Sequence, residues 1–269
     1  MLARKPAVAG SFYPESASEL KGLISASLTH RLFHRHQKRR WKAGLVPHAG
    51  YVYSGACAAS FYSSLSAATK LFVILGTNHT GMGAPISIAP HEKWLTPLGE
   101  SAVELEIAKQ LQELPQAALE PLAHIYEHSI EVQLPFIQYF FPEAKILPIV
   151  VGLPPNHTSL PLLRALGEKL REVLPAHSVV LASSDMSHYL PASEAERRDK
   201  AAIEALLRVD PEELFRVIHD YKVSMCGASA AAAMLYYAED CEGKLLDYYT
   251  SGDVMEMDKV VGYAAMGFV

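Results

Sequence analysis

Three short hydrophobic runs in this sequence each lead into a loop that carries a histidine, namely His48, His79 and His188. Apolar runs bounded by turn residues predict buried parallel strands, and open α/β sheets bind ligands at the carboxyl ends of such strands. Taken alone, a histidine such as His48 is more often a hydrogen-bonded structural residue. The recurrence favours a metal site instead, because three imidazoles would meet in one crevice. The runs span residues 44–47, 71–76 and 179–184.

A carboxylate stands close to the third of these histidines. Asp185 and His188 are three residues apart, so they face one site if the loop turns helically. Asp185 could orient His188 through a ring N–H, hold a metal-bound water or ligate the metal directly, and the sequence leaves these roles open. Asp185 is also a suitable cap for the N-terminus of a helix, where Ser and Asp are preferred.

One of the three cysteines stands in a context that suits a ligand. Cys226 precedes an alanine-rich segment, residues 229–237, that is predicted to be a buried helix. Backbone N–H groups and the dipole at a helix N-terminus favour the thiolate that binds metals, although a buried inert cysteine is the alternative. Cys57 and Cys241 lack this context and are predicted to be structural. The odd count fits reduced thiols in a cytosolic protein better than disulfides.

A further pair of titratable residues is expected near the same site. On a helix, His128 and Glu131 would share one face, which suits a proton relay or the support of a metal ligand. The alternative is a helix-capping histidine with a solvated glutamate. Apolar residues and Pro135 follow directly, which favours burial of the pair.

The elements that must position these residues alternate along the chain. Without a repeat, a low-complexity tract or a Gly/Ser linker, the sequence favours one domain over residues 1–269. We expect an α/β fold, a single three-layer domain with a central mostly parallel or mixed sheet flanked by helices. Residues 90–97 are expected to be irregular. Helices are predicted at residues 18–32, 54–65, 101–114, 159–173, 192–209 and 229–237 and from Pro211, and strands at 44–47, 71–75, 146–151, 179–182, 245–250 and 260–269.

Composition excludes several classes of function. The formal net charge of −5 argues against nucleic-acid binding, and the one dense basic run, residues 31–42, is expected to be a solvated face, with a patch for an acidic partner as the alternative. No apolar stretch approaches the roughly 20 residues of a membrane helix. The first residues lack the apolar core of a signal peptide, so a cytoplasmic protein is expected.

Together these motifs resemble one family over nearly the whole chain. The sequence is similar to the Memo family, whose bacterial and archaeal members are called AmmeMemoRadiSam system protein B. The similarity includes the opening Ala9-Gly10-Ser11-Phe12-Tyr13 and the closing Gly262-Tyr263-Ala264-Ala265. The motifs that carry it are Pro47-His48-Ala49-Gly50-Tyr51 with Ser54-Gly55, Leu75-Gly76-Thr77-Asn78-His79, Glu127-His128-Ser129-Ile130-Glu131, Ser183-Ser184-Asp185 with His188, and Cys226-Gly227.

The resemblance implies a fold and a set of ligands. Memo proteins share the fold of class III extradiol dioxygenases, which are LigB-like non-haem iron enzymes. By motif, His48, His79 and Cys226 correspond to the metal-binding set, and Asp185 and His188 line the same pocket. The dioxygenase histidine that resembles His188 acts as an acid and base. A thiolate in place of the usual carboxylate ligand favours copper, zinc or an iron of different redox character.

Three classes of function follow from this reading. The leading one is a metal-dependent oxidoreductase with iron or copper in a His/His/Cys pocket. The second is a metallohydrolase in which Glu131 or His128 takes a proton from metal-bound water. The third is a binding or scaffold protein, for which the family's bacterial name implies AMMECR-type and radical SAM partners. The ligand would be a small molecule or a peptide. The aromatic residues Tyr51, Tyr53, Trp94 and Tyr189 could shape its pocket, although packing in the core is the commoner use of aromatic residues.

Overall fold

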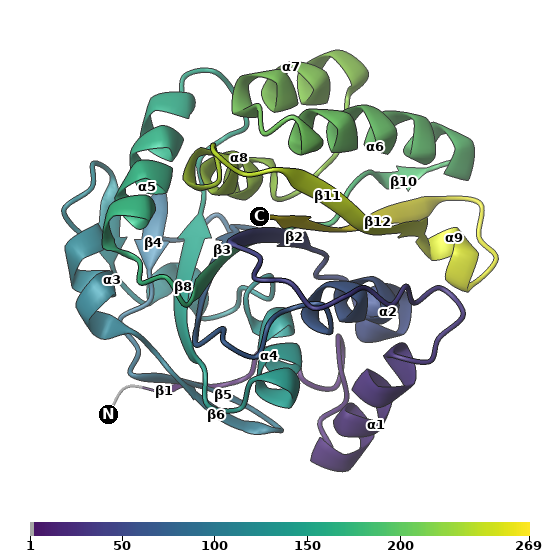
Figure 1. The fold of residues 1–269 in the computed structure, drawn as a ribbon, viewed down its shortest axis with the longest axis horizontal. Coiled ribbons are helices and arrows are strands. Elements are labelled where there is room, and N and C mark those ends of the chain that lie inside the picture. Colours follow the sequence, from purple (N-terminus) through teal and green to yellow (C-terminus); the bar gives the residue numbers. More distant parts are fainter. Residues whose placement is uncertain (1–2) are drawn as a thin grey trace.

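A computed structural model describes residues 3–269, and its core is a nine-stranded mixed sheet flanked by helices (Figure 1). The strand order is β10-β12-β2-β9-β3-β8-β4-β7, and β11 pairs with β12. Strands β2, β9, β3 and β8 form a parallel centre. The strands of this sheet are β2 (Ala43–Val46), β3 (Leu71–Thr77), β4 (Ile86–Ile88), β7 (Ala117–Leu119), β8 (Lys145–Val151), β9 (Ser178–Ser183), β10 (His188–Leu190), β11 (Gly243–Thr250) and β12 (Val260–Phe268).

Helices cover both faces of this sheet, which gives the expected three layers (Figure 1). On one face lie α3 (Leu105–Leu111), α5 (Leu160–Val173), α6 (Ala192–Leu207), α7 (Pro211–Tyr221) and α8 (Ala228–Tyr237). On the other face lie α1 (Ala17–Ser27), α2 (Tyr51–Tyr62) and α4 (Leu134–Phe140), and the short helix α9 (Ser251–Val254) follows β11. The α/β class and the mixed sheet are therefore confirmed.

The central strands are apolar on both sides because both of their faces are buried. In β3, Leu71, Val73 and Leu75 belong to one hydrophobic cluster, whereas Phe72 and Ile74 belong to the other. Successive side chains of a strand point to opposite faces, so a continuous apolar run fills two cores at once. This is why the runs that precede the predicted site show no polar alternation.

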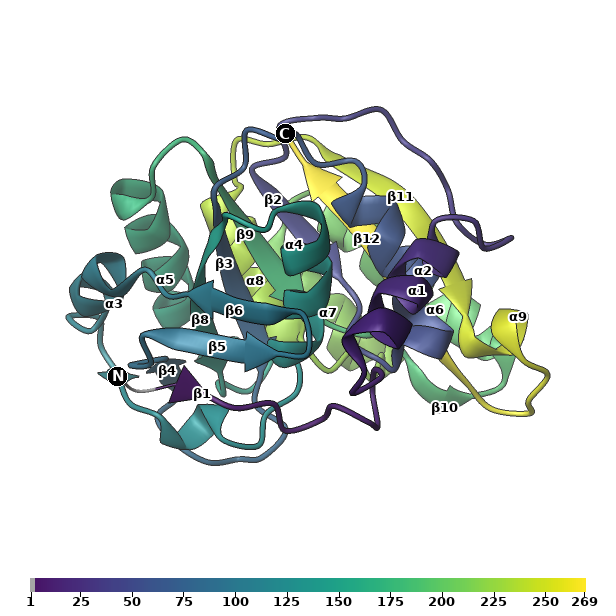
Figure 2. The same ribbon diagram turned by 90° about the horizontal axis from the view of Figure 1, so that it is seen from below.

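Residues 90–97 differ from the prediction in part. Residues 90–92 are irregular, as expected, but β5 (Lys93–Thr96) and β6 (Gly99–Ala102) form a hairpin that pairs with β1 (Ala3–Arg4) in a separate three-stranded sheet (Figure 2). The helix predicted from residue 101 therefore begins only at Leu105. Four residues with one buried tryptophan, Trp94, give too short an alternation to be recognised in a sequence.

Both strands predicted near the C-terminus are present, as β11 and β12. Strands β11 and β12 are antiparallel to each other, and β12 is antiparallel to β2.

Within residues 3–269, no helix is both long enough and apolar enough to cross a bilayer.

Candidate metal centre

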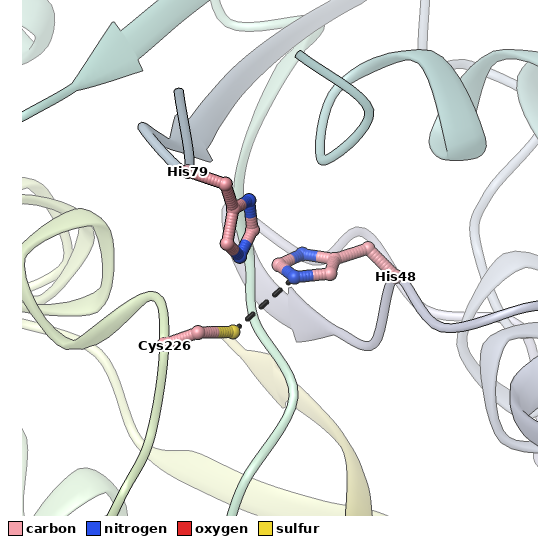
Figure 3. Close-up of side chains that lie close together, drawn as sticks. All are labelled: His48, His79 and Cys226. Atoms are coloured by element: carbon pink, nitrogen blue, oxygen red, sulfur yellow. Dashed lines mark hydrogen bonds between the residues drawn. The ribbon is translucent and has the colours of Figure 1, made fainter. Parts of the chain in front are cut away.

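The carboxyl ends of three neighbouring strands carry the predicted site. Strands β2 and β3 lie on either side of β9, with Val46 paired to Ser183 at the last register position of β2 and β9. His48 lies two residues beyond β2, and His79 two residues beyond β3. Cys226 reaches the same point from the loop that precedes α8 (Figure 3). The sheet thus brings together side chains that are up to 178 residues apart.

The donor atoms of these three residues are close enough to share one ion. The ligand atoms of His48, His79 and Cys226 lie within 4.8 Å of one another, and Nε2 of His48 is 3.2 Å from Sγ of Cys226. A tetrahedral ion with ordinary bond lengths, about 2.3 Å to sulfur and about 2.0 Å to nitrogen, holds these atoms about 3.5 Å apart. The two imidazole rings are perpendicular, with centroids 5.2 Å apart (Figure 3). The arrangement therefore fits a metal ion with only small movements.

A hydrogen bond at Nδ1 of the buried His48 leaves its Nε2 free to bind a metal. Ser183 Oγ donates its only proton to the carbonyl of Ser129 at 2.6 Å. It must therefore accept the hydrogen bond that it forms with Nδ1 of His48 at 3.0 Å. Gln133 fills the remaining position on this hydroxyl by donating from Nε2 at 2.8 Å. The proton of His48 therefore lies on Nδ1, and the lone pair of Nε2 points towards Cys226.

His79 is oriented in the same way, with a carboxylate holding its Nδ1. Glu127, which is buried, accepts from the backbone N–H of His79 at 2.6 Å and from its Nδ1 at 2.9 Å. Burial lowers the pKa of His79, but hydrogen bonds to Cys226 and Glu127 outweigh it and raise the pKa to about 9. Burial raises the pKa of Glu127, but the hydrogen bond and charge of His79 lower it to about 2. This carboxylate–imidazole pair is the usual outer support of a metal-binding histidine.

Backbone and hydroxyl groups surround the sulfur of Cys226. The N–H of Asp185 points at Sγ from 3.3 Å, and the hydroxyl of Ser184 lies 3.7 Å from it. Ser184 Oγ also accepts from the N–H of Gly227 at 2.8 Å, which fixes the loop at the start of α8. The expected position of the thiol beside a helix N-terminus is confirmed, because α8 begins two residues further on, at Ala228.

Asp185 shapes the site through its backbone contacts. Its Oδ1 accepts from the N–H groups of His48, at 2.8 Å, and Ala49, at 3.3 Å, so it holds the loop that carries the first ligand. The prediction of a helix cap is wrong, because β10 and not a helix follows at His188. Within residues 3–269, the group of donor atoms contains only His48, His79 and Cys226. The carboxylate of Asp185 is not part of it.

His188 lies beside the loop of the thiol and is not one of the three grouped donors. Its N–H donates to Ser224 Oγ at 2.7 Å, and its Nδ1 donates to the carbonyl of Ser224 at 2.9 Å. Its ring is therefore tied to the segment that carries Cys226, two residues further on, and its Nε2 is left free.

His128 packs directly on a predicted ligand. Its ring stacks on His79 with centroids 4.4 Å apart, and Phe12 covers it at 4.6 Å. Burial, together with the nearby His48, lowers the pKa of His128 to about 3, so its imidazole is neutral at pH 7. His79, Glu127 and His128 form a second group of donor atoms within 4.8 Å of one another.

Glu131 does not share a face with His128. It begins a short 3-10 turn, residues 131–133, and its carboxylate forms a buried ion pair with Arg4. The same carboxylate accepts from the N–H groups of Ala7 and Val8 and from the hydroxyl of Tyr13. With its oxygens occupied in this way, Glu131 anchors the N-terminal segment, and we remove it from the candidate proton acceptors.

Sequence reasoning missed Glu127, Ser183 and Gln133, although they orient both histidines. Glu127 stands directly before His128 in a motif that the sequence singled out, so its type and position offered a signal. Ser183 likewise stands in the motif Ser183-Ser184-Asp185, whereas Gln133 offered no signal, because it is a common polar residue outside the motifs. The aromatic pocket is wrong in part: Tyr51 and Trp94 are buried in the core, whereas Tyr189 is 72% exposed.

Comparisons with known proteins agree with the motifs and the geometry. The model of the family described as Memo-like protein matches residues 4–267. A protein of Aquifex aeolicus described as a MEMO1 family protein is 40% identical over the full length of both chains. A protein of Archaeoglobus fulgidus with the same description is 40% identical over 98% of this chain and 99% of its own.

A solved structure supports the fold alone. The crystal structure of an uncharacterized protein from Escherichia coli K12 superposes with a TM-score of 0.57, at 12% identity, over 84% of this chain and 99% of that one. At this identity, the similarity extends to the architecture of the sheet and its helices.

Proposed function

This chain belongs to the Memo-like protein family, and we propose that it is a metal-dependent oxidoreductase that binds iron or copper through His48, His79 and Cys226. One observation carries the proposal: three donor atoms lie within 4.8 Å of one another at the carboxyl ends of the central strands. Both imidazoles also present Nε2 there, because Ser183 and Glu127 hold the other nitrogen.

The donor set favours a redox metal over a purely structural one. A structural zinc site takes four protein ligands, whereas three ligands leave a position for a substrate. Two imidazoles and a thiolate suit copper and iron, and such an ion supplies one-electron exchange when bound. The thiolate distinguishes this set from the two histidines and one carboxylate of many iron oxygenases. We therefore do not extend the proposal to ring cleavage.

The other residues of the site would orient the ligands and hold protons. Glu127 and Ser183 fix the two rings, and Asp185 holds the backbone of His48 while its N–H stabilises negative charge on the sulfur of Cys226. His128 stacks on His79 and, neutral at pH 7, is proposed as a hydrogen-bond partner for a bound substrate. His188 presents a free Nε2 beside the Cys226 loop and is proposed as a second acid or base.

The test is the metal content and redox state of protein purified without added metal. We expect iron or copper at close to one ion per chain, an anaerobic electron paramagnetic resonance signal that changes on reduction, and loss of the metal in Cys226→Ser. The matched control is Cys241→Ser, a free and partly buried cysteine outside the donor set. Equal metal content in the Cys226→Ser variant and the wild type would refute the site. Tightly held zinc with ester or amide hydrolysis would instead favour a metallohydrolase.

A further inference from the structure

The arginines of this protein fall into two groups. Every arginine outside residues 31–42 has a carboxylate oxygen within 4.0 Å. The arginines inside that segment are Arg31, Arg35, Arg39 and Arg40, and in the structure of residues 3–269 none of them forms such an ion pair. A protein with a net charge of −5 has enough acidic groups to pair them. Within residues 3–269, the arginines without an ion pair therefore all lie in one segment, the connection from α1 to β2.

Part of this segment forms the wall of a small cavity. The cavity has a volume of about 240 Å³ and includes cations from two different elements, the segment itself and the start of β11. Its charged and polar lining consists of Arg35, His36, Gln37, Arg39 and Lys244. Lys244 also lacks a carboxylate partner among the ion pairs of the described residues, and no carboxylate lines this cavity.

The segment is fixed in place, although it has no regular secondary structure. The N–H of Arg39 donates to the carbonyl of Ser64 at 2.7 Å, and its carbonyl accepts from Ser66 at 2.8 Å. His36 donates from Nε2 to the carbonyl of Leu246, on β11, at 2.7 Å. The guanidinium of Arg39 lies over the ring of the buried Trp41, 5.7 Å from its centroid. These contacts hold the cations on a preformed scaffold, which lowers the entropy cost of binding a ligand.

The nearby buried carboxylate does not neutralise them. Asp247 accepts from the hydroxyl of Ser60 at 2.8 Å and pairs with Nδ1 of His34 at 2.9 Å. Both of its oxygens therefore have partners, and neither partner lines the cavity. The positive charge of Arg35, Arg39 and Lys244 is left for an external anion.

We propose that this cavity binds a phosphate group, either as a diphosphate or as a small phosphate monoester. Guanidinium groups bind phosphate through paired, charge-assisted hydrogen bonds, and a lysine adds a compact charge. Two arginines and a lysine match the two or more negative charges of a phosphate better than the single charge of a carboxylate. The small volume suits a phosphate-sized group and excludes a large ligand.

The phosphate site and the metal site lie at opposite ends of β2. The basic segment enters β2 at Ala43, whereas His48 follows its other end, beyond Val46. In Figure 2 the basic segment is the dark blue connection between α1 and β2, and it passes close to the C-terminus. The proposal therefore does not depend on the oxidoreductase function, and either can fail without the other.

Isothermal titration calorimetry of the full chain at low salt tests the proposal. The probes are inorganic phosphate, inorganic pyrophosphate and glycerol 3-phosphate, which separate a free phosphate, a diphosphate and a monoester as the source of the group. We expect saturable binding of at least one probe. We also expect the double variant R35Q/R39Q to weaken that binding by at least tenfold and Lys244→Gln to weaken it by a smaller factor.

The control is the double variant R164Q/R216Q, which removes two arginines that are paired with carboxylates on the helical face. It should bind the probe as the wild type does, and circular dichroism should show that all variants are folded. The proposal is overturned if no probe binds the wild type at millimolar concentration. It is also overturned if R164Q/R216Q weakens binding as much as R35Q/R39Q, because the effect would then be one of net charge.

Discussion

Glu127 and Glu131 are two buried carboxylates that are four residues apart and serve different parts of the molecule. Glu127 accepts from the backbone and ring of His79 and from the N–H groups of His128 and Ser129. Glu131 accepts from Arg4 and from the segment that follows it. Burial and residue type are the same in both cases, so the partner alone separates a residue of the metal centre from an anchor of the fold.

The difference lies in how each negative charge is balanced. The guanidinium of Arg4 is charged at every ordinary pH, so the Glu131 pair is permanent. The charge on His79 depends on whether its Nε2 carries a proton, and a metal ion would compete for that nitrogen. Glu127 is thus coupled to metal binding, whereas Glu131 is coupled only to folding.

The largest effect is expected from Glu131→Gln. This change leaves Arg4 buried without a counterion, so we expect the free energy of unfolding to fall by about 3–5 kcal/mol. Urea unfolding measures it, and metal titration of the remaining folded protein should give the wild-type affinity. A variant that keeps its stability but loses its metal would reverse the assignment of the two glutamates.

Glu127→Gln should act mainly on metal affinity, in contrast to Glu131→Gln, which should act on stability. Without the carboxylate, His79 loses the charge that makes its ring a stronger ligand. At pH 9 and above, where a proton no longer competes for Nε2, we expect metal affinity to fall by about 10–100-fold. Competition of Zn²⁺ against a chromophoric chelator gives the affinity, and Glu131→Gln is the matched control. Wild-type affinity in Glu127→Gln would show that its contacts with His79 are structural only.

The pH dependence of metal binding should distinguish the same pair. The pKa of His79 is raised to about 9, so a proton occupies Nε2 at neutral pH, and affinity should rise about tenfold for each pH unit up to about 9. In Glu127→Gln the rise of metal affinity with pH should end at a lower pH. The thiol of Cys226 is present in both this variant and the wild type, so its contribution cancels when the two profiles are compared. Identical profiles would mean that Glu127 does not set the pKa of His79.

The stability of the metal-free protein should follow the opposite trend. The folded pKa of His79, about 9, exceeds its unfolded value of about 6.5, so its stabilising effect is complete below about pH 6.5 and is lost as the pH rises through 9. Glu127 has a depressed pKa of about 2, so its contribution is lost only as the pH falls towards 2. Thermal unfolding of metal-free protein from pH 6 to 10 checks the sign.

The smallest effect is expected from Ser183→Ala. The neutral hydroxyl that holds His48 is worth about 1 kcal/mol, so metal affinity should fall by less than tenfold. Ser187→Ala is a close control, because Ser187 is also buried and its hydroxyl has no hydrogen-bond partner among residues 3–269. A loss as large as that of Glu127→Gln would show that the tautomer of His48 matters as much as the charge beside His79.

Much of the fold could be predicted because its core is periodic. The apolar runs of β3, β8 and β9 stand out, since strands buried on both faces leave no polar residues to interrupt them. The hairpin of β5 and β6 could not be predicted, because its strands are short and are held by pairing with β1, about 90 residues earlier in the chain. Local propensity carries no information about such a distant partner.

The amino-acid sequence by itself determined which side chains could bind a metal and placed two of them just beyond strand ends. It could not determine which carboxylate would serve them. Glu131 finds its partner in Arg4, 127 residues away, and Glu127 finds His79, 48 residues away. The free energy of a buried charge depends on the groups that surround it in space, and only the tertiary structure brings those groups together.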